Sequence, residues 1–404
     1  MSRDLQPFRS TATGLNTRRK LIAALVVLSF MSYVVYRGAN RGSDFKYPYG
    51  AARLLWTTGK LHVQAQPRYP LSLHVLLSPL AGLPFWAAVS VWAAISFASM
   101  AALPGVLARL SDIDPRRQFL AWVLVAPFFA DALILGQSDP INIFLVAAGL
   151  LAAKQGRAGA GAMLVGLAGM IKILPSVHWL TIFARTRSWR VWPGIVLTIL
   201  LGLGLIVAAA GWEPALLALR EQAQWLRDQE KPWHLVARGG DLRPNNESLP
   251  IVLARTFGDL PTNRRDPNAT SLARLPLPLI WSAWFTILGA MAVAWLASVR
   301  PAERLDDGRG WLALFALTSI IMLAATPICW NHYFLWTFPA ALFLNHRPKL
   351  LVAAAILSLI GSASQTARAL GCHMALALGL FLLVAVDLRR EARSRSVSPA
   401  TEPP

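Results

Sequence analysis

The sequence predicts an all-α, polytopic integral membrane protein, and three observations lead to this prediction. Of the 404 residues, 55% are hydrophobic and 15% are charged, whereas a soluble domain carries about 25% charged residues. Apolar runs recur along the chain, and at roughly 20 residues per span they leave room for about 11 to 12 membrane segments. The net charge of +19 is concentrated in short basic clusters between these runs, as the positive-inside rule predicts for cytoplasmic loops.

The basic clusters divide the chain into three parts. Residues 1–20 are predicted to be a cytoplasmic tail, and residues 21–388 a transmembrane domain. Residues 389–404 are basic and then rich in Ser and Pro, which predicts a disordered cytoplasmic tail. The first apolar run, 21–36, has no small-residue cleavage site after it and is therefore interpreted as an uncleaved first span.

The remaining spans follow from the alternation of apolar and polar segments. Two long polar segments, 37–84 and 211–275, are predicted on the outer side, the first partly as helices along the membrane surface. Spans are predicted at 85–108, 119–135, 141–153, 191–210, 276–298, 311–326, 332–345, 350–367 and 371–387. With these spans every basic loop lies on one side of the membrane, and both ends of the chain are cytoplasmic.

The apolar segment 158–184 does not fit a simple crossing, because basic loops flank both of its ends. Lys172-Ile173-Leu174-Pro175 interrupts it. Two short helices forming a re-entrant hairpin would keep both basic loops inside, with Lys172 at the break, and a single crossing is the alternative. Broken helices at membrane depth are tolerated where they are buried in protein or line a cavity.

Three polar residues near the outer ends of spans are candidates for chemistry, and each has an alternative interpretation. Asp44 is either a general base that removes a proton from a hydroxyl group, or a solvated loop carboxylate, or the N-cap of a helix at 47–58. His332 either binds a phosphate or belongs to an aromatic belt with its neighbours. Lys172 either meets a lipid phosphate or extends its ammonium group to the membrane surface.

Several cofactor motifs are absent from the sequence. There is no GxxxxGK[ST] phosphate loop, no GxGxxG and no HExxH, which argues against nucleotide cofactors and an intramembrane zinc protease. The outer loops lack a dense carboxylate cluster, and Cys329 and Cys372 have no CxxC spacing. We therefore expect no cofactor and no bound metal. Because the basic residues lie in separate loops rather than on one face, we also expect no nucleic acid partner.

A series of short motifs in a fixed order gives the chain a family resemblance. The motifs are Asp44 with Ala51-Ala52-Arg53-Leu54-Leu55 and Gly59, Tyr69-Pro70, Leu76-Leu77-Ser78-Pro79-Leu80 with Leu83-Pro84, Leu135-Gly136-Gln137, Gly166-Leu167-Ala168 with Lys172-Ile173-Leu174-Pro175, Asn246-Glu247-Ser248-Leu249 with Arg255, and Pro327 with Trp330-Asn331-His332-Tyr333. Over about residues 40–345 the chain resembles the glycosyltransferase family 87 of GT-C membrane enzymes, the polyprenyl-phosphate-mannose-dependent α-mannosyltransferases. The chain departs from the family pattern at Leu71, where a second Pro is usual, and at Glu247, where Gln is usual.

The resemblance implies a GT-C multi-helix bundle in the bacterial inner membrane, with its active site on the periplasmic side. The donor would be a polyprenyl-phosphate-linked mannose, the acceptor a hydroxyl of a lipid-linked or envelope glycan, and the reaction inverting. By this resemblance Asp44 is the catalytic base and His332 lies near the donor phosphate. Further donor contacts are expected from Lys172 and Arg255. Substrate contacts are expected from Tyr47, Arg53, Gln137, Asn246 and Trp330.

The chemistry of the implied reaction agrees with these residues. The leaving group is already a stabilised phosphate anion, and basic side chains can offset its charge without a metal ion. A transporter or flippase for a lipid-linked sugar is the competing class, but it should show paired broken helices in two related halves, and this chain has one break. A non-catalytic membrane scaffold would have no need of Asp44.

Overall fold

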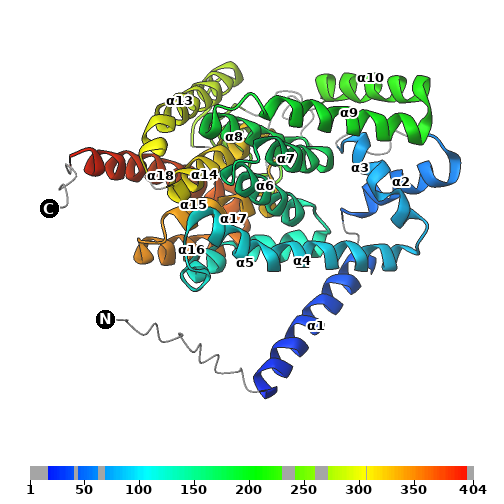
Figure 1. Ribbon diagram of the computed structural model, residues 1–404, viewed down its shortest axis with the longest axis horizontal. Coiled ribbons are helices and arrows are strands. Elements are labelled where there is room, and N and C mark those ends of the chain that lie inside the picture. The colour runs from blue at the N-terminus through cyan, green and yellow to red at the C-terminus, as the bar shows by residue number, and fades with distance from the viewer. Residues whose placement is uncertain are drawn as a thin grey trace, which may run out of the picture.

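The computed structural model describes residues 17–40, 44–61, 69–229, 242–259, 272–305 and 307–397. Within these ranges the chain is helical, apart from turns and one isolated β-bridge between Gly258 and Leu275 (Figure 1). The α-helices are α1 (Thr17–Asn40), α2 (Lys46–Thr58), α3 (Leu71–Ala81), α4 (Phe85–Ser111), α5 (Phe119–Leu135), α6 (Asp139–Lys154), α7 (Ala158–Ile171), α8 (Trp179–Thr186), α9 (Val191–Ala210), α10 (Trp212–Gln229), α12 (Leu249–Phe257), α13 (Leu277–Arg304), α14 (Asp307–Ala325), α15 (Phe338–Phe343), α16 (Pro348–Ala363), α17 (Gln365–Ala369) and α18 (Cys372–Val397). The 3-10 helices used below are η3 (Leu174–His178) and η5 (Asn331–Thr337).

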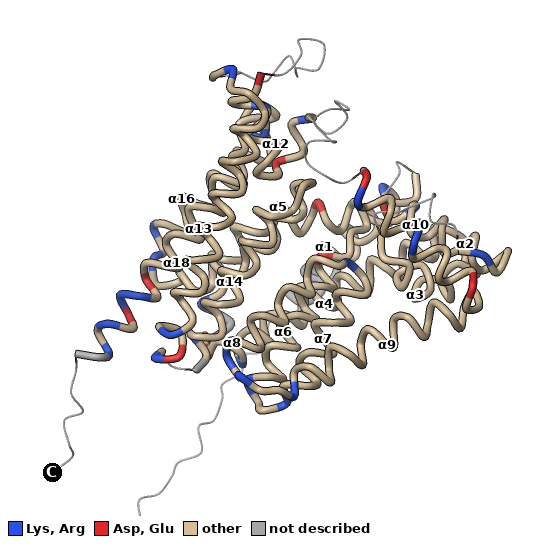
Figure 2. Tube along the Cα trace, turned by 90° about the horizontal axis from the view of Figure 1, so that it is seen from above, with Lys and Arg blue, Asp and Glu red and all other residues tan. Residues whose placement is uncertain are grey.

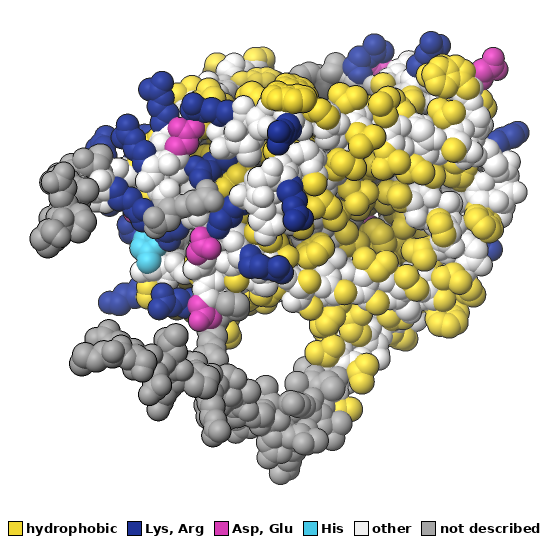
Figure 3. Space-filling view, viewed as in Figure 1, with side chains coloured by type: hydrophobic (Ala, Val, Ile, Leu, Met, Phe, Trp, Pro, Cys, Tyr) yellow, Lys and Arg dark blue, Asp and Glu magenta, His cyan; other side chains and the backbone are white. Residues whose placement is uncertain are grey.

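Helix α14 lies at the centre of the bundle, where it contacts α13, α15 and α18. Its apolar stretch is 83% buried, whereas the apolar stretches of α9 and α13 are 22% and 17% buried. Figure 3 shows the broad hydrophobic surface that results, with Lys and Arg gathered toward one end of the molecule. Helices that are apolar on their outer face need a lipid environment, so the chain is a multi-pass membrane protein, as predicted.

In the described part of the chain, five helices are long and apolar enough to cross a membrane, namely α4, α9, α13, α14 and α18. A sixth span arises if α5 and α6 are counted as one bent span. The sequence predicts about 11 to 12 segments, and the difference has a physical cause: several apolar runs fold as short helices. The run 332–345, predicted as one span, is η5 followed by the six-residue helix α15, and α3, α7 and α16 are also short.

The helix break predicted at Lys172 is confirmed. Helix α7 ends at Ile171, and Lys172 is extended, with φ −153° and ψ 124°. The chain continues through η3 into α8, which contacts α7. Pro175 has no N–H group to continue the α-helical hydrogen bonds, which explains why the apolar run breaks at this point.

Helix α18 continues to Val397, which corrects the prediction that a disordered tail begins at residue 389. The carboxylate of Glu391 accepts hydrogen bonds from Arg309 at the start of α14, and this ion pair holds the end of α18 against the bundle. The predicted N-terminal tail 1–20 lies largely outside the described residues, as do residues 398–404. Figure 2 shows groups of Lys and Arg near α8 and along the end of α18, and further Lys and Arg beside α10, α12 and α2.

Helices α6, α7 and α9 pack with their backbones in direct contact. A Cβ atom at Gly149 or at Gly161 would collide with the carbonyl oxygen of the other glycine, and one at Gly194 would collide with the carbonyl oxygen of Gly159. Small residues at helix contacts allow this close approach in membrane proteins. The packing holds the start of α7 against α6 and α9, and at the other end of α7 Lys172 contacts Asp139 of α6.

Candidate active site

Asp139 is the centre of a buried polar cluster at the start of α6. Its side chain is 1% exposed, and Lys172 Nζ donates hydrogen bonds to its two carboxylate oxygens at 2.9 and 3.1 Å. Trp336 Nε1 donates to Asp139 Oδ1 at 3.0 Å, and the first turn of a helix favours a carboxylate. A carboxylate buried this deeply needs such partners. Lys172 is therefore held inside the protein and does not extend to the membrane surface.

His332, in η5, lies against the same carboxylate. Its side chain is 1% exposed, with Nε2 3.8 Å from Asp139 Oδ2 and Nδ1 3.7 Å from Asp131 Oδ2. Neither ring nitrogen makes a hydrogen bond to any described residue. Because buried polar groups are normally hydrogen-bonded, these two nitrogens are suited to receive a ligand. The fold thus brings Lys172 and His332 together from distant parts of the sequence.

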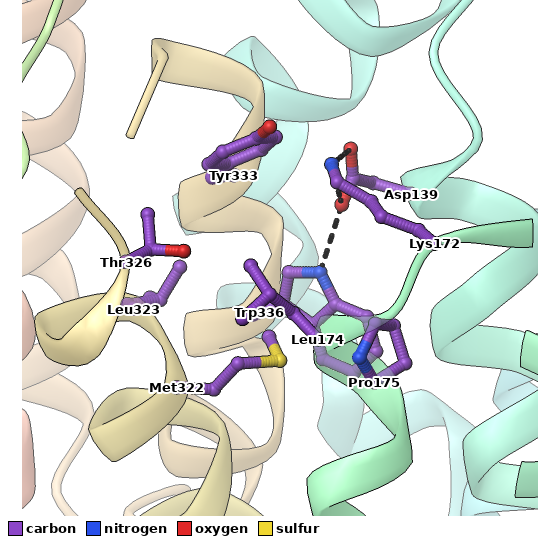
Figure 4. A pocket seen from close by; sticks show the side chains of 9 residues that line it. All are labelled: Asp139, Lys172, Leu174, Pro175, Met322, Leu323, Thr326, Tyr333 and Trp336. Atoms are coloured by element: carbon purple, nitrogen blue, oxygen red, sulfur yellow. Dashed lines mark hydrogen bonds and ion pairs between the residues drawn. The ribbon is translucent and has the colours of Figure 1, made fainter. Parts of the chain in front are cut away.

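A small, partly open pocket, called the cavity below, lies beside the pair of Asp139 and Lys172 (Figure 4). The ring of Tyr333 also lines it, with its centroid 3.6 Å from Lys172 Nζ. The rest of the lining is formed by Leu174, Pro175, Met322, Leu323, Thr326 and Trp336. A cavity with mostly apolar walls and one polar corner has the composition of a small-molecule site.

One apolar core supports the charged residues of this region. Phe45 is 1% exposed and stacks on Trp92, with ring centroids 5.3 Å apart. Ile141 of α6 and Ile171 at the end of α7 belong to the same core. Asp44 directly precedes Phe45 in the chain, and the site lysine directly follows Ile171. Packing of these apolar neighbours therefore holds the carboxylate and the ammonium group on the same side of the bundle.

Asp44 lies just before α2, where its carboxylate accepts a hydrogen bond of 2.6 Å from Gln137 Nε2. The backbones of the two segments are also hydrogen-bonded, because Phe45 N–H donates to the carbonyl oxygen of Leu135 at 3.3 Å. The cap residue of α2 is Phe45, and no side chain caps the helix. The interpretation of Asp44 as a helix cap is therefore wrong. Gly136, which ends α5 with φ +67°, makes the turn that brings Gln137 to Asp44.

Tyr69 connects Asp44 to the cluster around Asp139. Burial raises the pKa of its hydroxyl group, and Tyr333 raises it further. The charge of Lys172 lowers this pKa, whereas those of Asp44 and Asp139 raise it. These four side chains are therefore near enough to the phenol for their charges to act on it.

The predicted substrate residue Asn246 is buried and holds the loop that leads into η5. Its Oδ1 accepts hydrogen bonds from the N–H groups of Cys329, at 3.0 Å, and Ser248, at 3.2 Å. Ser248 Oγ donates to the carbonyl oxygen of Pro327 at 2.8 Å. Through these contacts the segment before α12 fixes the backbone just ahead of His332.

The other predicted site residues lie apart from the cavity. Arg255 is 3% exposed and donates to the carbonyl oxygens of Leu242, Arg243, Asn246, Arg368 and Ala369, which ties α12 to α17. Tyr47 and Arg53 are exposed on α2, and Trp330 packs beneath the guanidinium of Arg243 at 5.0 Å. The described residues contain no group of three or more His, Cys, Asp and Glu able to hold a metal ion.

The model of glycosyltransferase family 87 matches residues 68–327. The chain belongs to glycosyltransferase family 87. The polyprenol-phosphate-mannose-dependent alpha-(1-2)-phosphatidylinositol pentamannoside mannosyltransferase of Mycolicibacterium smegmatis is 24% identical to it over 354 residues, which cover 82% of this chain and 77% of that protein. No solved structure matches the chain.

Membership of family 87 makes the chain a glycosyltransferase and decides against the transporter and scaffold classes. The matched range contains Gln137, Lys172 and Asn246. Asp44 and His332 lie outside it, so their inclusion in the candidate site of this family-87 enzyme rests on the contacts described above.

Sequence reasoning missed three residues of this family-87 site. Asp131 carries a charge inside the apolar run 119–135, and an intramembrane carboxylate is itself a signal of function. Asp139 and Trp336 give no such signal. Acidic residues are common at the start of a helix, and tryptophan is common within an apolar run.

Proposed function

We propose that this glycosyltransferase moves mannose from a polyprenyl-phosphate donor to a hydroxyl of a lipid-linked or envelope glycan. The reaction inverts the anomeric centre and takes place at the periplasmic face of the bacterial inner membrane. The observation that carries the proposal is the similarity to a mannosyltransferase whose name specifies polyprenol-phosphate-mannose. In the proposal Asp44 is the general base, and Lys172 and His332 bind the donor phosphate.

The donor side of the proposal is supported by the two cationic or potentially cationic groups around Asp139. Lys172 and His332 approach the same oxygen, Asp139 Oδ2, at 2.9 and 3.8 Å. A lysine at membrane depth needs an anionic partner, and Asp139 supplies one while the site holds no donor. A donor phosphate in the cavity would share Lys172 with Asp139. His332 is not part of the cavity lining, so it would donate to a phosphate oxygen that takes the place of Asp139 Oδ2 beside its Nε2. Both contacts stabilise the phosphate that leaves.

The acceptor side of the proposal is supported by the position of Asp44. Its carboxylate is half-buried, and one oxygen is oriented by Gln137. The proton of the acceptor hydroxyl passes to Asp44 as the oxygen attacks the anomeric carbon. The bond from that carbon to the phosphate oxygen breaks on the opposite face, which inverts the centre. A base on one side and a phosphate site on the other meet the needs of this single displacement.

The proposed topology predicts which positions are labelled from outside the cell. Glu213 on α10 and Arg390 on α18 are both exposed, and they lie on opposite sides of the membrane in the proposal. In a Cys372→Ser background, a membrane-impermeant maleimide should label Glu213→Cys in intact cells and Arg390→Cys only after lysis. Buried Cys329 should stay unlabelled in the parent. Labelling of Arg390→Cys in intact cells would place the end of α18 outside and overturn the topology.

The proposed activity predicts transfer of labelled mannose from polyprenyl-phosphate-mannose to a membrane glycolipid by the purified enzyme in EDTA. Hydrolysis of the product by a linkage-specific α-mannosidase should release the label, because inversion of a β-linked donor gives an α-linkage. Polyprenyl-phosphate-glucose serves as the matched donor control and should react at least about tenfold more slowly. Equal rates with both donors would contradict mannose as the sugar, and loss of activity in EDTA would contradict a metal-free reaction.

A further inference from the structure

Glu247 and His373 form an ion pair in the interior, away from the cavity. Both side chains are 0% exposed, with His373 Nδ1 2.7 Å from Glu247 Oε1. The second carboxylate oxygen, Oε2, accepts a hydrogen bond of 3.0 Å from the backbone N–H of His373. His373 Nε2 lies 3.1 Å from the carbonyl oxygen of Ser358 in α16. Two fully buried charged side chains are stable only when well-placed hydrogen bonds offset the loss of water around both of them.

Hydrogen-bond accounting shows that the pair is charge-balanced. The carbonyl oxygen of Ser358 only accepts, so His373 Nε2 carries a proton. One further proton lies between His373 Nδ1 and Glu247 Oε1, and with it the pair has no net charge. Removing His373 would leave a carboxylate in the interior without its charged partner. Changing Glu247 to Gln would not, because an amide can donate to Nδ1 of a neutral imidazole and still accept from the His373 N–H.

The pair contacts the segment that carries His332 on both sides of that residue. Before it, the backbone N–H of Glu247 donates to the carbonyl oxygen of Cys329 at 2.8 Å. After it, the ring of His373 packs on Phe334, with centroids 5.2 Å apart. Cys329, His332 and Phe334 are each at most 1% exposed, so this stretch lies in the packed interior where the pair contacts it.

We propose that Glu247 and His373 are positioning residues that hold the segment from Pro327 to Phe334, so that His332 faces the donor phosphate. The inference rests on the proposed function for its effect on the donor, but its structural part does not. Neither residue touches the cavity lining. Their effect is transmitted through the backbone at Cys329 and the ring at Phe334.

The test uses the full-length enzyme with Cys372→Ser, which leaves Cys329 as its only cysteine. The variants are His373→Leu, Glu247→Gln and the double variant Glu247→Gln/His373→Leu. Two quantities are measured for each: the rate at which a small maleimide labels Cys329, and the Michaelis constant for polyprenyl-phosphate-mannose. Thermal unfolding is recorded in parallel, so that a general loss of stability is separated from displacement of the segment.

His373→Leu leaves the Glu247 carboxylate without a charged partner, so both the labelling rate and the donor constant should rise at least about tenfold. Glu247→Gln should stay within about threefold of the parent, because its hydrogen bonds are complete. The double variant should return to within about threefold on both measurements, since it buries no charge. This rescue distinguishes charge balance from mere loss of packing.

Several outcomes overturn the inference. One is that His373→Leu labels Cys329 no faster than the parent and has the same Michaelis constant for the donor. This outcome counts even if the variant unfolds at a lower temperature. Faster labelling with an unchanged donor constant would show that the pair holds the segment without setting the site. If His373→Leu does not fold, His373→Asn takes its place, because its amide still donates to Glu247 while losing Ser358. No change there in either measurement also overturns the inference. If the parent transfers no mannose, the proposed function fails while the labelling measurement still tests the pair.

Discussion

Replacing Asp44 with Asn is expected to lower turnover by at least about a hundredfold, because an amide cannot take the proton of the acceptor hydroxyl. Folding should be unaffected, since the Asn carbonyl still accepts the hydrogen bond from Gln137 that the carboxylate accepts at 2.6 Å. The measurement is the initial rate of mannose transfer from polyprenyl-phosphate-mannose, normalised to the amount of folded enzyme. The donor constant should change little, because Asp44 acts on the acceptor.

Asp112→Asn is the matched control for this substitution. Asp112 ends α4 with φ +58°, a conformation that Asn also adopts readily. Its side chain is 65% exposed in the ion pair with Lys154, and Lys154 also donates to the carbonyl oxygens of Arg109 and Leu110, so loss of this pair should cost little stability. The control should retain turnover within about twofold, as expected for a surface pair. If Asp44→Asn were as active as this control, another residue would have to be the base.

Replacing Lys172 with Met is expected to have the second largest effect, and it should act on two properties. The apparent constant for the donor should rise at least about tenfold, because a hydrogen bond to a charged group contributes about 1.5–3 kcal/mol. The free energy of unfolding should fall by about 3–5 kcal/mol, since Asp139 would remain buried without its cation. Donor titrations and thermal unfolding measure the two effects separately.

The double variant Asp139→Asn/Lys172→Met separates these effects. The amide of the new side chain buries no charge and still accepts from Trp336 Nε1, which lies 3.0 Å from Asp139 Oδ1. Stability should therefore return to within about 1 kcal/mol of the parent, whereas the donor constant should remain raised. Recovery of donor affinity in the double variant would mean that Lys172 serves only to neutralise Asp139.

The features that could be predicted from the sequence are those encoded locally. A proline after a lysine in an apolar run marks the break at Lys172, and a polar loop after the first span identifies Asp44. Span boundaries such as 119–135 and 191–210 coincide with α5 and α9, because turns with glycine or charge interrupt the apolar pattern there. The predicted number of membrane-crossing helices is too high, because hydropathy alone does not distinguish a crossing helix from a short buried one.

The partners of these residues could not be predicted, because they come from different helices whose packing is not encoded locally. That Lys172 meets Asp139 follows from how α7 packs on α6, and that Glu247 meets His373 follows from how the segment before α12 meets the start of α18. A single sequence carries no signal of such pairs. Arg255 shows the same limit. Its motif is visible in the sequence, but the carbonyl oxygens that its guanidinium binds are brought to it only by the fold.

The glycine contacts among α6, α7 and α9 restrict the route by which a lipid can reach the cavity. A polyprenyl chain has methyl branches and is wider than the space between two helices whose backbones touch. It cannot pass between α6 and α7 at Gly149 and Gly161, or between α7 and α9 at Gly194. The tail of a donor therefore cannot enter at these two helix contacts. At the depth of these contacts a donor tail would have to pass along other helices, so the smallest side chains of α6, α7 and α9 narrow its lateral route.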